Sequence, residues 1–367
     1  MLIGSQKAAF PSTPVDRRGT VACITITPSN GETIEKTCRR LAGIMLNHPE
    51  TPVHVLAFGD KRAESVARSE LCKSLGRFEW PLTWIEGCGC NGEPVAGMQV
   101  HMGTGEVHSI HWKGQVVGSV FEGDGARQCV IGAIMPEPGE LNRGAQVELA
   151  LETLQTIMEQ VGFDLGDLVR TWFFLEDILS WYREFNLART RVYSQIQFRT
   201  GSMPASTGVG AHNCFGSALA LVSWAHRPMS LTSRAREVGS PLQCPAMSYG
   251  SSFSRAMEMC SDSGRHLFIS GTASIAPAGE TLWASSATRQ VEVTMEVVES
   301  LLASRQMLFS DLVSATAYFR RPADAQILKE WLRVNNLSQL PVVLTQCDIC
   351  RDDLLFEIEA EAHRHGP

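Results

Sequence analysis

Residues 147–177 read "VELALETLQTIMEQVGFDLGDLVRTWFFLED", and residues 291–321 read "VEVTMEVVESLLASRQMLFSDLVSATAYFRR". The two stretches align without a gap, because both begin with Val-Glu, both contain Asp-Leu-Val near the end, and their apolar positions keep register. Each pattern predicts an amphipathic helix followed by a buried strand. Asp167 and Asp311 lie in the connections between helix and strand. A unit that occurs twice in one chain indicates repeated structural modules.

The flanking segments extend both copies. "ARQCVIGAIMP" and "GRHLFISGTASI" predict an opening strand, and "ILSWYREFNLARTRVYSQ" and "PADAQILKEWLRVNN" predict a second helix. "PASTGVGAHNCFGSALALVSWAH" (204–226) aligns without a gap with "PVVLTQCDICRDDLLFEIEAEAH" (341–363), and both predict strand–turn–strand. Residues 106–228 and 245–367 are therefore predicted to be two β-α-β-α-β-β modules.

The rest of the chain is divided in the same way. Residues 1–105 predict the same order of elements with a weak sequence match, and we interpret them as a degenerate third module. Residues 229–244 are polar and aperiodic, and are predicted to be a linker. The first twenty residues have no apolar core before a small-residue cleavage site, so we interpret them as a poorly ordered tail rather than a secretion signal.

Composition excludes several classes of protein. The net charge of −7 over 367 residues argues against a general nucleic-acid binder. No segment reaches the roughly 18–20 apolar residues that span a membrane, and we expect a cytoplasmic protein. The eleven cysteines are odd in number and lack disulfide spacing, so we expect reduced thiols. The pairs Cys88/Cys90 and Cys347/Cys350 lie too far apart to predict a zinc site, and the histidines show no metal spacing.

The last strand raises a question of chemistry. "LLFEIEAEAH" (354–363) alternates, so Glu357, Glu359 and Glu361 would share one face. That face is either solvated or carries a proton donor.

The repeat helps to decide between these readings. The aligned positions of the middle module are apolar: Ala220, Val222 and Trp224. A strand that is apolar on both faces is buried on both faces. Burial would raise the pKa of Glu357 and make it an acid near neutral pH, whereas Glu359 and Glu361 stay open between the two readings.

These motifs resemble a known superfamily. "SGTASI" (270–275), "SDLVSATAYF" and "FEIEAEA" are similar to the Rid/YjgF proteins, whose small α/β units form trimers with ligand sites between subunits. "MPASTGVGA" (203–211), "FSRA" (253–256) and a cysteine shortly before the terminal glutamate resemble the chorismatases of the 3-hydroxybenzoate-forming type. The resemblance covers most of residues 106–365. It implies an α/β (α+β) fold of tandem Rid/YjgF-like modules, a pseudo-trimer in one chain that a monomer can complete.

The resemblance also implies an activity and catalytic residues. A chorismatase cleaves the enolpyruvyl ether of chorismate to pyruvate and 3-hydroxybenzoate, without a metal or redox cofactor. Glu357 would protonate the enol methylene, and Cys350 resembles the cysteine that accompanies the benzoate product. Cys347 is a second candidate, because a hairpin turning at 351–353 would place it opposite Glu357. Only one module keeps the terminal carboxylate, so we expect one site, between the C-terminal module and a neighbour.

A dianionic substrate needs cations. We favour Arg255, whose strand should line the cleft beside Gly271, a glycine that lets a ligand approach the backbone. The further candidates are Arg191 with Tyr193, Arg320, Arg127 and Arg265.

Other functions stay open. A hydrolase would give a dihydroxycyclohexadiene carboxylate plus pyruvate. An imine deaminase is disfavoured, because the arginine that such enzymes carry in a Pro-Ala-Arg pattern is absent at 204–206 and 341–342. A non-catalytic module that binds a small metabolite or a partner protein is the remaining alternative, and neither a nucleic acid nor a membrane is expected as a partner.

Overall fold

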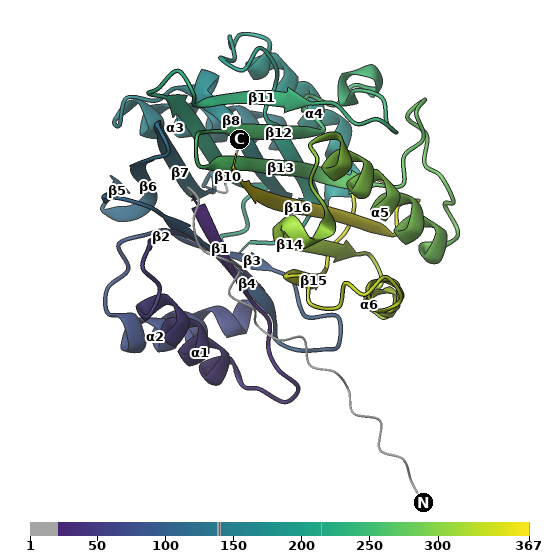
Figure 1. Ribbon diagram of the computed structural model, residues 1–367, viewed down its shortest axis with the longest axis horizontal. Coiled ribbons are helices and arrows are strands. Elements are labelled where there is room, and N and C mark those ends of the chain that lie inside the picture. The colour runs from purple at the N-terminus through teal and green to yellow at the C-terminus, as the bar shows by residue number, and fades with distance from the viewer. Residues whose placement is uncertain (1–20, 138, 140, 214, 367) are drawn as a thin grey trace, which may run out of the picture.

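The computed structural model describes residues 21–137, 139, 141–213 and 215–366, so the interpretation of residues 1–20 as a tail lies outside the described residues. The described chain forms three sheets (Figure 1). No helix in the described part has both the length and the apolar character needed to cross a membrane.

The first sheet has four strands in the order β1-β4-β2-β3. Its elements follow the predicted β-α-β-α-β-β order: β1 (Val21–Ile26), α1 (Ile34–Leu46), β2 (Thr51–Gly59), α2 (Lys61–Leu75), β3 (Leu82–Glu86) and β4 (Val95–Gly103).

The second sheet has six strands in the order β5-β6-β7-β10-β8-β9. Its elements are β5 (Val107–Trp112), β6 (Gln115–Gly123), β7 (Ala126–Ile134), α3 (Arg143–Glu159), β8 (Leu168–Leu175), α4 (Ile178–Tyr193), β9 (Ala205–Gly210) and β10 (Leu219–Pro228). The hairpin β5–β6 precedes the six predicted elements.

The third sheet repeats this arrangement in the order β11-β12-β13-β16-β14-β15. Its elements are β11 (Arg234–Val238), β12 (Ala256–Cys260), β13 (Gly264–Ala273), α5 (Ala287–Ser304), β14 (Leu312–Phe319), α6 (Ala325–Val334), β15 (Val342–Gln346) and β16 (Phe356–His365). Because all three sheets share one order of four core strands, the predicted fold class of tandem modules is confirmed.

Two local predictions are wrong. Residues 229–244 were expected to be an irregular linker, but they contain β11, whose backbone pairs with β12. The last two strands were expected to form a hairpin, but β14 lies between them, since β15 pairs in parallel with β14 and β16 pairs antiparallel with it. A helix between β14 and β15 makes the parallel pairing possible.

The repeated connections have the same local chemistry. The carboxylate of Asp167 accepts a hydrogen bond from the backbone N–H of Asp164 at 3.0 Å, and that of Asp311 accepts one from Leu308 at 2.7 Å. Each aspartate closes a single helical turn just before a central strand, β8 or β14. Local hydrogen bonding of this kind favours a turn over continued helix.

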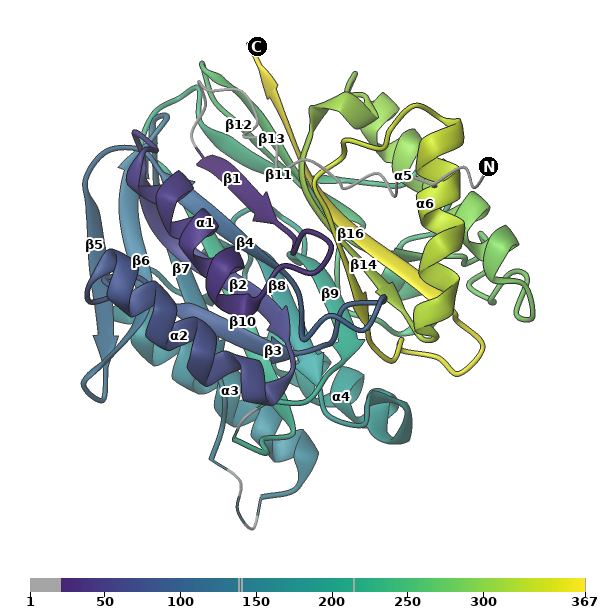
Figure 2. The ribbon, with the colours of Figure 1, turned by 90° about the horizontal axis from the view of Figure 1, so that it is seen from below.

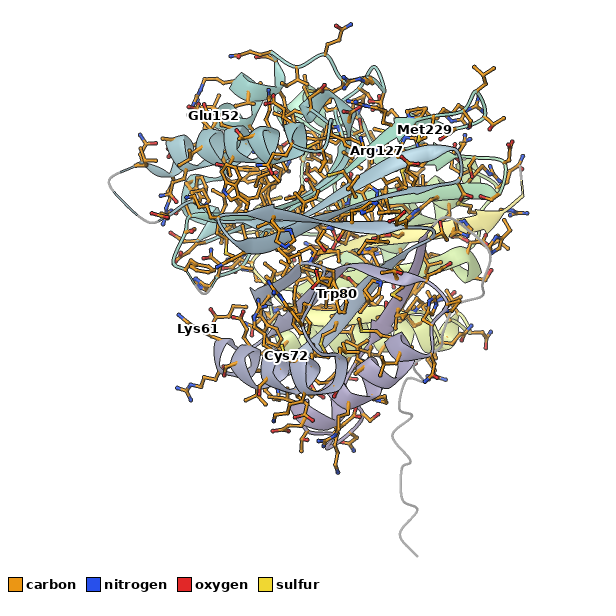
Figure 3. The ribbon with its side chains drawn as sticks, turned by 90° about the vertical axis from the view of Figure 1, so that its left-hand side faces the viewer. Lys61, Cys72, Trp80, Arg127, Glu152 and Met229 are labelled. Atoms are coloured by element: carbon orange, nitrogen blue, oxygen red, sulfur yellow. The ribbon has the colours of Figure 1, made fainter. Side chains whose placement is uncertain are left out.

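The helices lie outside and the sheets face one another (Figure 2). Figure 3 shows Glu152 on α3 and Cys72 on α2 at opposite outer sides, with strands between them. A central core joins all three sheets and includes Phe58 from the first, Trp224 from the second and Phe268 from the third. The strands that enter this core are therefore covered on both faces.

Candidate active site

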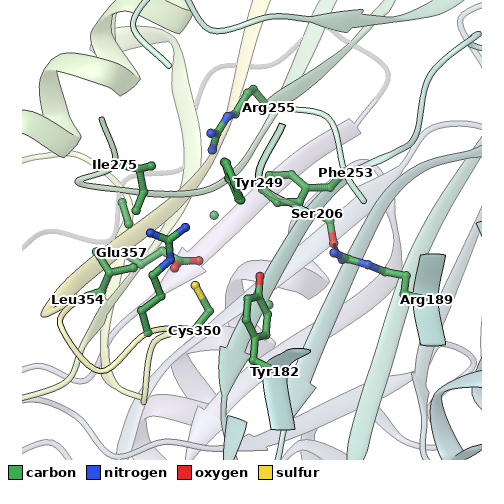
Figure 4. Close-up of a pocket in the computed structure, with 14 residues that line it drawn as sticks. Tyr182, Arg189, Ser206, Tyr249, Phe253, Arg255, Ile275, Cys350, Leu354 and Glu357 are labelled. Carbon is green, nitrogen blue, oxygen red and sulfur yellow. Dashed lines mark hydrogen bonds between the residues drawn. The ribbon is translucent and has the colours of Figure 1, made fainter. Parts of the chain in front are cut away.

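A pocket lies where the second and third sheets meet (Figure 4). Its cavity volume is about 40 Å³. The second module contributes residues of α4 and β9, and the third contributes β13, β16 and irregular segments. The lining residues are Tyr182, Arg189, Ser206, Gly208, Tyr249, Phe253, Arg255, Gly271, Ala273, Ile275, Cys350, Arg351, Leu354 and Glu357.

Glu357 is the carboxyl group of this pocket. It is only 4% exposed, and the described residues donate no hydrogen bond to its carboxyl. Burial raises the pKa of Glu357 to about 8, the negative charge of Glu359 adds to the effect, and Arg170 and Arg255 oppose it. A carboxyl in this state is a proton donor at neutral pH.

Gly271 lies on β13 beside Glu357. A Cβ at this position would collide with Oε1 of Glu357, so the missing side chain leaves the space that the carboxyl fills. We expected this glycine to admit a ligand; the structure gives it a different role, because it accommodates the acid itself.

Glu359 and Glu361 are also buried, so the solvated reading of this face of β16 is wrong. Glu359 accepts hydrogen bonds from Tyr318 at 2.8 Å, from Arg170 at 2.5 Å and from Thr207.

Glu361 is the third carboxylate of this face. It binds the ring nitrogens of His101 on β4 at 2.9 Å and of His266 on β13 at 3.1 Å. It therefore ties the first module to the third.

Cys350 faces the same cavity as Glu357, and Figure 4 shows both groups and the hydroxyl of Tyr182 directed into one space. Burial of the thiol and the nearby Glu357 raise the pKa of Cys350 to about 12, while hydrogen bonding with Tyr182 opposes the shift. The thiol therefore keeps its proton at neutral pH. Burial likewise raises the pKa of Tyr182.

Three arginines surround the cavity. Arg255 donates from Nε to the carbonyl of Cys244 at 3.0 Å, and its Nη2 has no partner among the described residues. Arg351 donates to the carbonyl of Gly279 at 2.8 Å. Both guanidinium groups lie over the ring of Tyr249, at 5.3 and 5.4 Å from its centre.

Arg189 approaches the cavity from the second module. It donates to Asn186 at 2.8 Å and lies 3.4 Å from the hydroxyl of Ser206. Its Nε has no partner within the described chain, although the residue is only 2% exposed. A buried donor without a partner is unusual in a folded protein, and it is suited to an anionic ligand.

Four predicted site residues do not line the pocket. The side chain of Arg191 is 59% exposed and pairs with Glu148. Tyr193 is packed in the core of the second module. Cys347 follows β15, which β14 separates from β16, and Arg320 binds the carbonyl of Asp352.

The two weaker candidates, Arg127 and Arg265, are also elsewhere. Arg127 lies over the ring of Phe163 at 5.4 Å, and Arg265 is 3.9 Å from Glu258.

The sequence analysis missed ten lining residues, five of which have aromatic or cationic side chains: Tyr182, Arg189, Tyr249, Phe253 and Arg351. A helical pattern was available for two of them, because Tyr182 and Arg189 are seven residues apart in α4 and so share one face. Of the other three, Tyr249 ends a short 3-10 helix, and Phe253 and Arg351 lie in irregular segments; none has a periodic signal. The described residues contain no group of three or more His, Cys, Asp or Glu side chains arranged to hold a metal.

Comparisons with known proteins agree with these observations. Residues 108–223 match the family model of the chorismatase FkbO/Hyg5-like N-terminal domain. A 3-hydroxybenzoate synthase from Streptomyces hygroscopicus is 26% identical over 237 residues, which are 57% of this chain and 67% of the relative. A chorismatase from the same organism is 28% identical over 247 residues, or 60% of this chain and 68% of the relative.

A solved structure shows the same fold. The crystal structure of a chorismatase covers 94% of this chain and 100% of its own, with a TM-score of 0.69 and 20% identity. The family model and the two relatives confirm the predicted resemblance to the chorismatases, and the solved structure confirms the fold.

Proposed function

We propose that this relative of the chorismatases is itself a chorismatase, which cleaves chorismate to pyruvate and 3-hydroxybenzoate. The observation that carries the proposal is Glu357, a buried carboxyl whose pKa is raised to about 8 in a cleft with three arginines. The name of one relative, a 3-hydroxybenzoate synthase, supports this product, and the name of the other, a chorismatase, supports the reaction.

The first step is a proton transfer. Glu357 donates its proton to the methylene carbon of the enolpyruvyl group, and the carbon–oxygen unit of the ether becomes an oxocarbenium ion. The carboxylate left behind is close enough to stabilise that cation. The bond between the ring and the ether oxygen then breaks, with its electron pair passing to oxygen, and pyruvate leaves.

The second step decides the product. When the neighbouring ring hydroxyl attacks the carbon that pyruvate leaves, its proton returns to Glu357 and the ring rearranges to 3-hydroxybenzoate. This route consumes no water. We propose that Cys350 and Tyr182 fill the cavity beside Glu357 and exclude the water that would otherwise give the dihydrodiol. Their raised pKa values keep both groups protonated and uncharged.

The arginines give the site its charge preference. We propose that Arg189, Arg255 and Arg351 hold the two carboxylates of the substrate, in place of the predicted Arg191 and Arg320. Arg189 and Arg255 each have a nitrogen without a partner in the described structure, so they can donate to a carboxylate without breaking an existing bond. Planar guanidinium groups suit this role because they grip a carboxylate through two hydrogen bonds.

The cavity must widen to admit the substrate. A volume of about 40 Å³ holds only a few water molecules by the usual measure. We expect the segments that carry Tyr249 and Arg351 to move, since Arg255 and Arg351 hold them through one hydrogen bond each to a backbone carbonyl. Both sides of the cleft belong to one chain, so we propose that a monomer is sufficient.

The test is incubation with chorismate, with pyruvate measured through lactate dehydrogenase and the second product identified by chromatography. We expect pyruvate and 3-hydroxybenzoate from the native protein, and a loss of about 10²–10⁴-fold in rate for Glu357→Gln. Glu292→Gln changes a partly exposed carboxylate on α5 that pairs with Arg289; it serves as the matched control and should retain the native rate.

Each other outcome has a distinct meaning. Pyruvate with a dihydrodiol would support Glu357 as the proton donor and would reject 3-hydroxybenzoate as the product. Pyruvate at the native rate from Glu357→Gln would reject the acid. No pyruvate from the native protein would reject the chorismatase proposal and favour a metabolite-binding module.

A further inference from the structure

Two carboxyl groups on one face of β16 have opposite surroundings. Glu359 accepts hydrogen bonds from three side chains, whereas the described residues donate none to Glu357. The two residues are separated by one position, so they are neighbours on the same face of the strand. Such a pair can divide its roles, with one group ionised and the other protonated.

The direction of the hydrogen bonds fixes the charge of Glu359. The hydroxyl oxygen of Thr207 accepts from the backbone N–H of Gly271 at 3.0 Å and from Arg170 at 2.6 Å. Its single proton is therefore left for Oε2 of Glu359, which must act as an acceptor. Arg170 donates to the same oxygen at 2.5 Å.

The other carboxylate oxygen is an acceptor too. Tyr318 donates to Oε1 of Glu359 at 2.8 Å, and burial keeps the pKa of this phenol well above its usual value. Tyr318 therefore holds its proton and donates it. With both oxygens accepting, Glu359 is a carboxylate.

A short structural link joins Glu359 to Glu357. Thr207 binds Glu359 with its hydroxyl and holds the N–H of Gly271, and the carboxyl of Glu357 fills the space that a side chain of Gly271 would take. The two carboxyl groups thus lie against one threonine–glycine pair, and both are buried. Charges interact strongly there because the local dielectric is low.

The other groups around Glu357 show which charges the carboxylate of Glu359 balances. On β8, Arg170 is a buried cation, and before β12 Arg255 is a second one; both favour ionisation of Glu357. The remaining groups that face the pocket are the cations Arg189 and Arg351 and the protonated groups Tyr182, Tyr249 and Cys350. Without Glu359, only cations and neutral groups of the described chain would surround the acid.

We propose that Glu359 is a positioning residue: its fixed negative charge cancels that of Arg170 and keeps Glu357 in the protonated form that donates to substrate. The inference rests on the proposed function, but the state of the two carboxyl groups can be measured without substrate.

The first experiment is infrared spectroscopy of the native protein between pH 6 and 7. A buried protonated carboxyl gives a carbonyl stretching band that a carboxylate lacks. We expect one such band, absent from Glu357→Gln and moved to lower pH in Glu359→Gln. A band that persists in Glu357→Gln and disappears in Glu359→Gln would place the proton on Glu359 and overturn the inference, whether or not chorismate is cleaved.

The second experiment is the pH dependence of kcat/KM for chorismate. Activity should fall as Glu357 ionises, and Glu359→Gln should move this fall about one pH unit lower. At pH 8 the variant should lose about fivefold more activity than at pH 6.

Tyr318→Phe is the control, since it removes a hydrogen bond to Glu359 but no charge. Its pH profile should stay in place. Equal shifts in both variants, or a shift in neither, would mean that Glu359 has only a structural role. A native protein without activity would instead reject the proposed function and leave the infrared result to decide the charge state.

Discussion

β10 and β16 occupy the same place in two modules, yet the same face carries apolar side chains on β10 and three carboxyl groups on β16. Each is the second of the four core strands, between the opening strand and the central strand of its sheet. Ala220, Val222 and Trp224 pair with Phe174, Trp172 and Arg170 on β8; Glu357, Glu359 and Glu361 pair with Tyr318, Thr316 and Ser314 on β14. The same backbone therefore supports a central core in one module and an acid site in the next.

The neighbouring strand explains how the exchange is possible. The register of the two sheets places Ala133 of β7 where Gly271 stands in β13. The N–H of Ala133 binds the hydroxyl of Thr83 at 3.0 Å, as that of Gly271 binds Thr207. Only the side chains differ: an alanine beside Ala220, and a glycine beside Glu357. A glutamate at this position of the strand thus requires a smaller residue, glycine in place of alanine, on the neighbouring strand.

Placing a glutamate in β10 should have the largest effect on stability. Ala220 is fully buried in the central core, so Ala220→Glu adds a carboxyl with neither space nor a hydrogen-bond partner. We expect a loss of about 4 kcal/mol or more in the free energy of unfolding, measured by urea denaturation. The double variant Ala133→Gly/Ala220→Glu should recover part of this loss. Equal stability of the single variant and the native protein would mean that the two strands are interchangeable.

The next largest effect concerns Glu361, which stands where β10 has Trp224. Burial alone would raise the pKa of Glu361, but His101 and His266 outweigh it and hold the pKa well below its usual range. A depressed pKa stabilises the fold above the ordinary carboxyl pKa of about 4.3 and loses that effect as the pH falls. Glu361→Gln should therefore cost about 3 kcal/mol at pH 7 and progressively less below about pH 4.

Trp224→Phe is the control for this pH dependence. It removes the hydrogen bond from the indole to Gln128, 2.9 Å long, but no titrating group. Its stability loss should stay constant across the same pH range in urea titrations. A loss for Glu361→Gln that is equally constant would exclude an ion pair at this position.

Gly271→Ala makes β13 resemble β7 and should have an intermediate effect. The new Cβ would collide with the carboxyl of Glu357, which must turn away from the cavity. We expect a stability loss of about 2 kcal/mol and a fall of about tenfold or more in pyruvate release. Gly239→Ala is the matched control, because a Cβ there has open space. Full activity in Gly271→Ala would show that the acid works from another position.

The sequence predicted the burial of Glu357 because a repeat supplied an internal reference. A lone alternating strand cannot distinguish a solvated face from a buried one, but an apolar copy at the same position can. The repeat could not reveal Tyr249, Phe253 or Arg351, since they lie in a short 3-10 helix and in irregular segments whose positions depend on long-range packing.

The order of the strands in the sheet was the second feature that could not be predicted from the sequence. Two strands separated by a short turn were interpreted as partners, which put Cys347 opposite Glu357. Pairing depends on the whole sheet, and β14 inserts between β15 and β16. In α4, Arg191 lies on the opposite side of the helix from Tyr182 and Arg189. Tyr193 shares their face but does not line the pocket.

The smallest effect on stability should come from Cys350, which the repeat aligns with Asn213. The side chain of Asn213 shapes its turn through bonds to Ser217 and Phe215, so Asn213→Ala should cost about 2 kcal/mol. Cys350 has no comparable role in its turn, and Cys350→Ala should cost about 1 kcal/mol.

Cys350→Ala should instead change the product, because the space left beside Glu357 admits water. The dihydrodiol should rise at the expense of 3-hydroxybenzoate, and total pyruvate should fall less than 3-hydroxybenzoate does. Chromatography of both products at equal conversion measures this ratio. An unchanged ratio would mean that the enclosure of the cavity, rather than the thiol, excludes water, and would leave Glu357 as the one residue that separates the chemistry of β16 from the packing of β10.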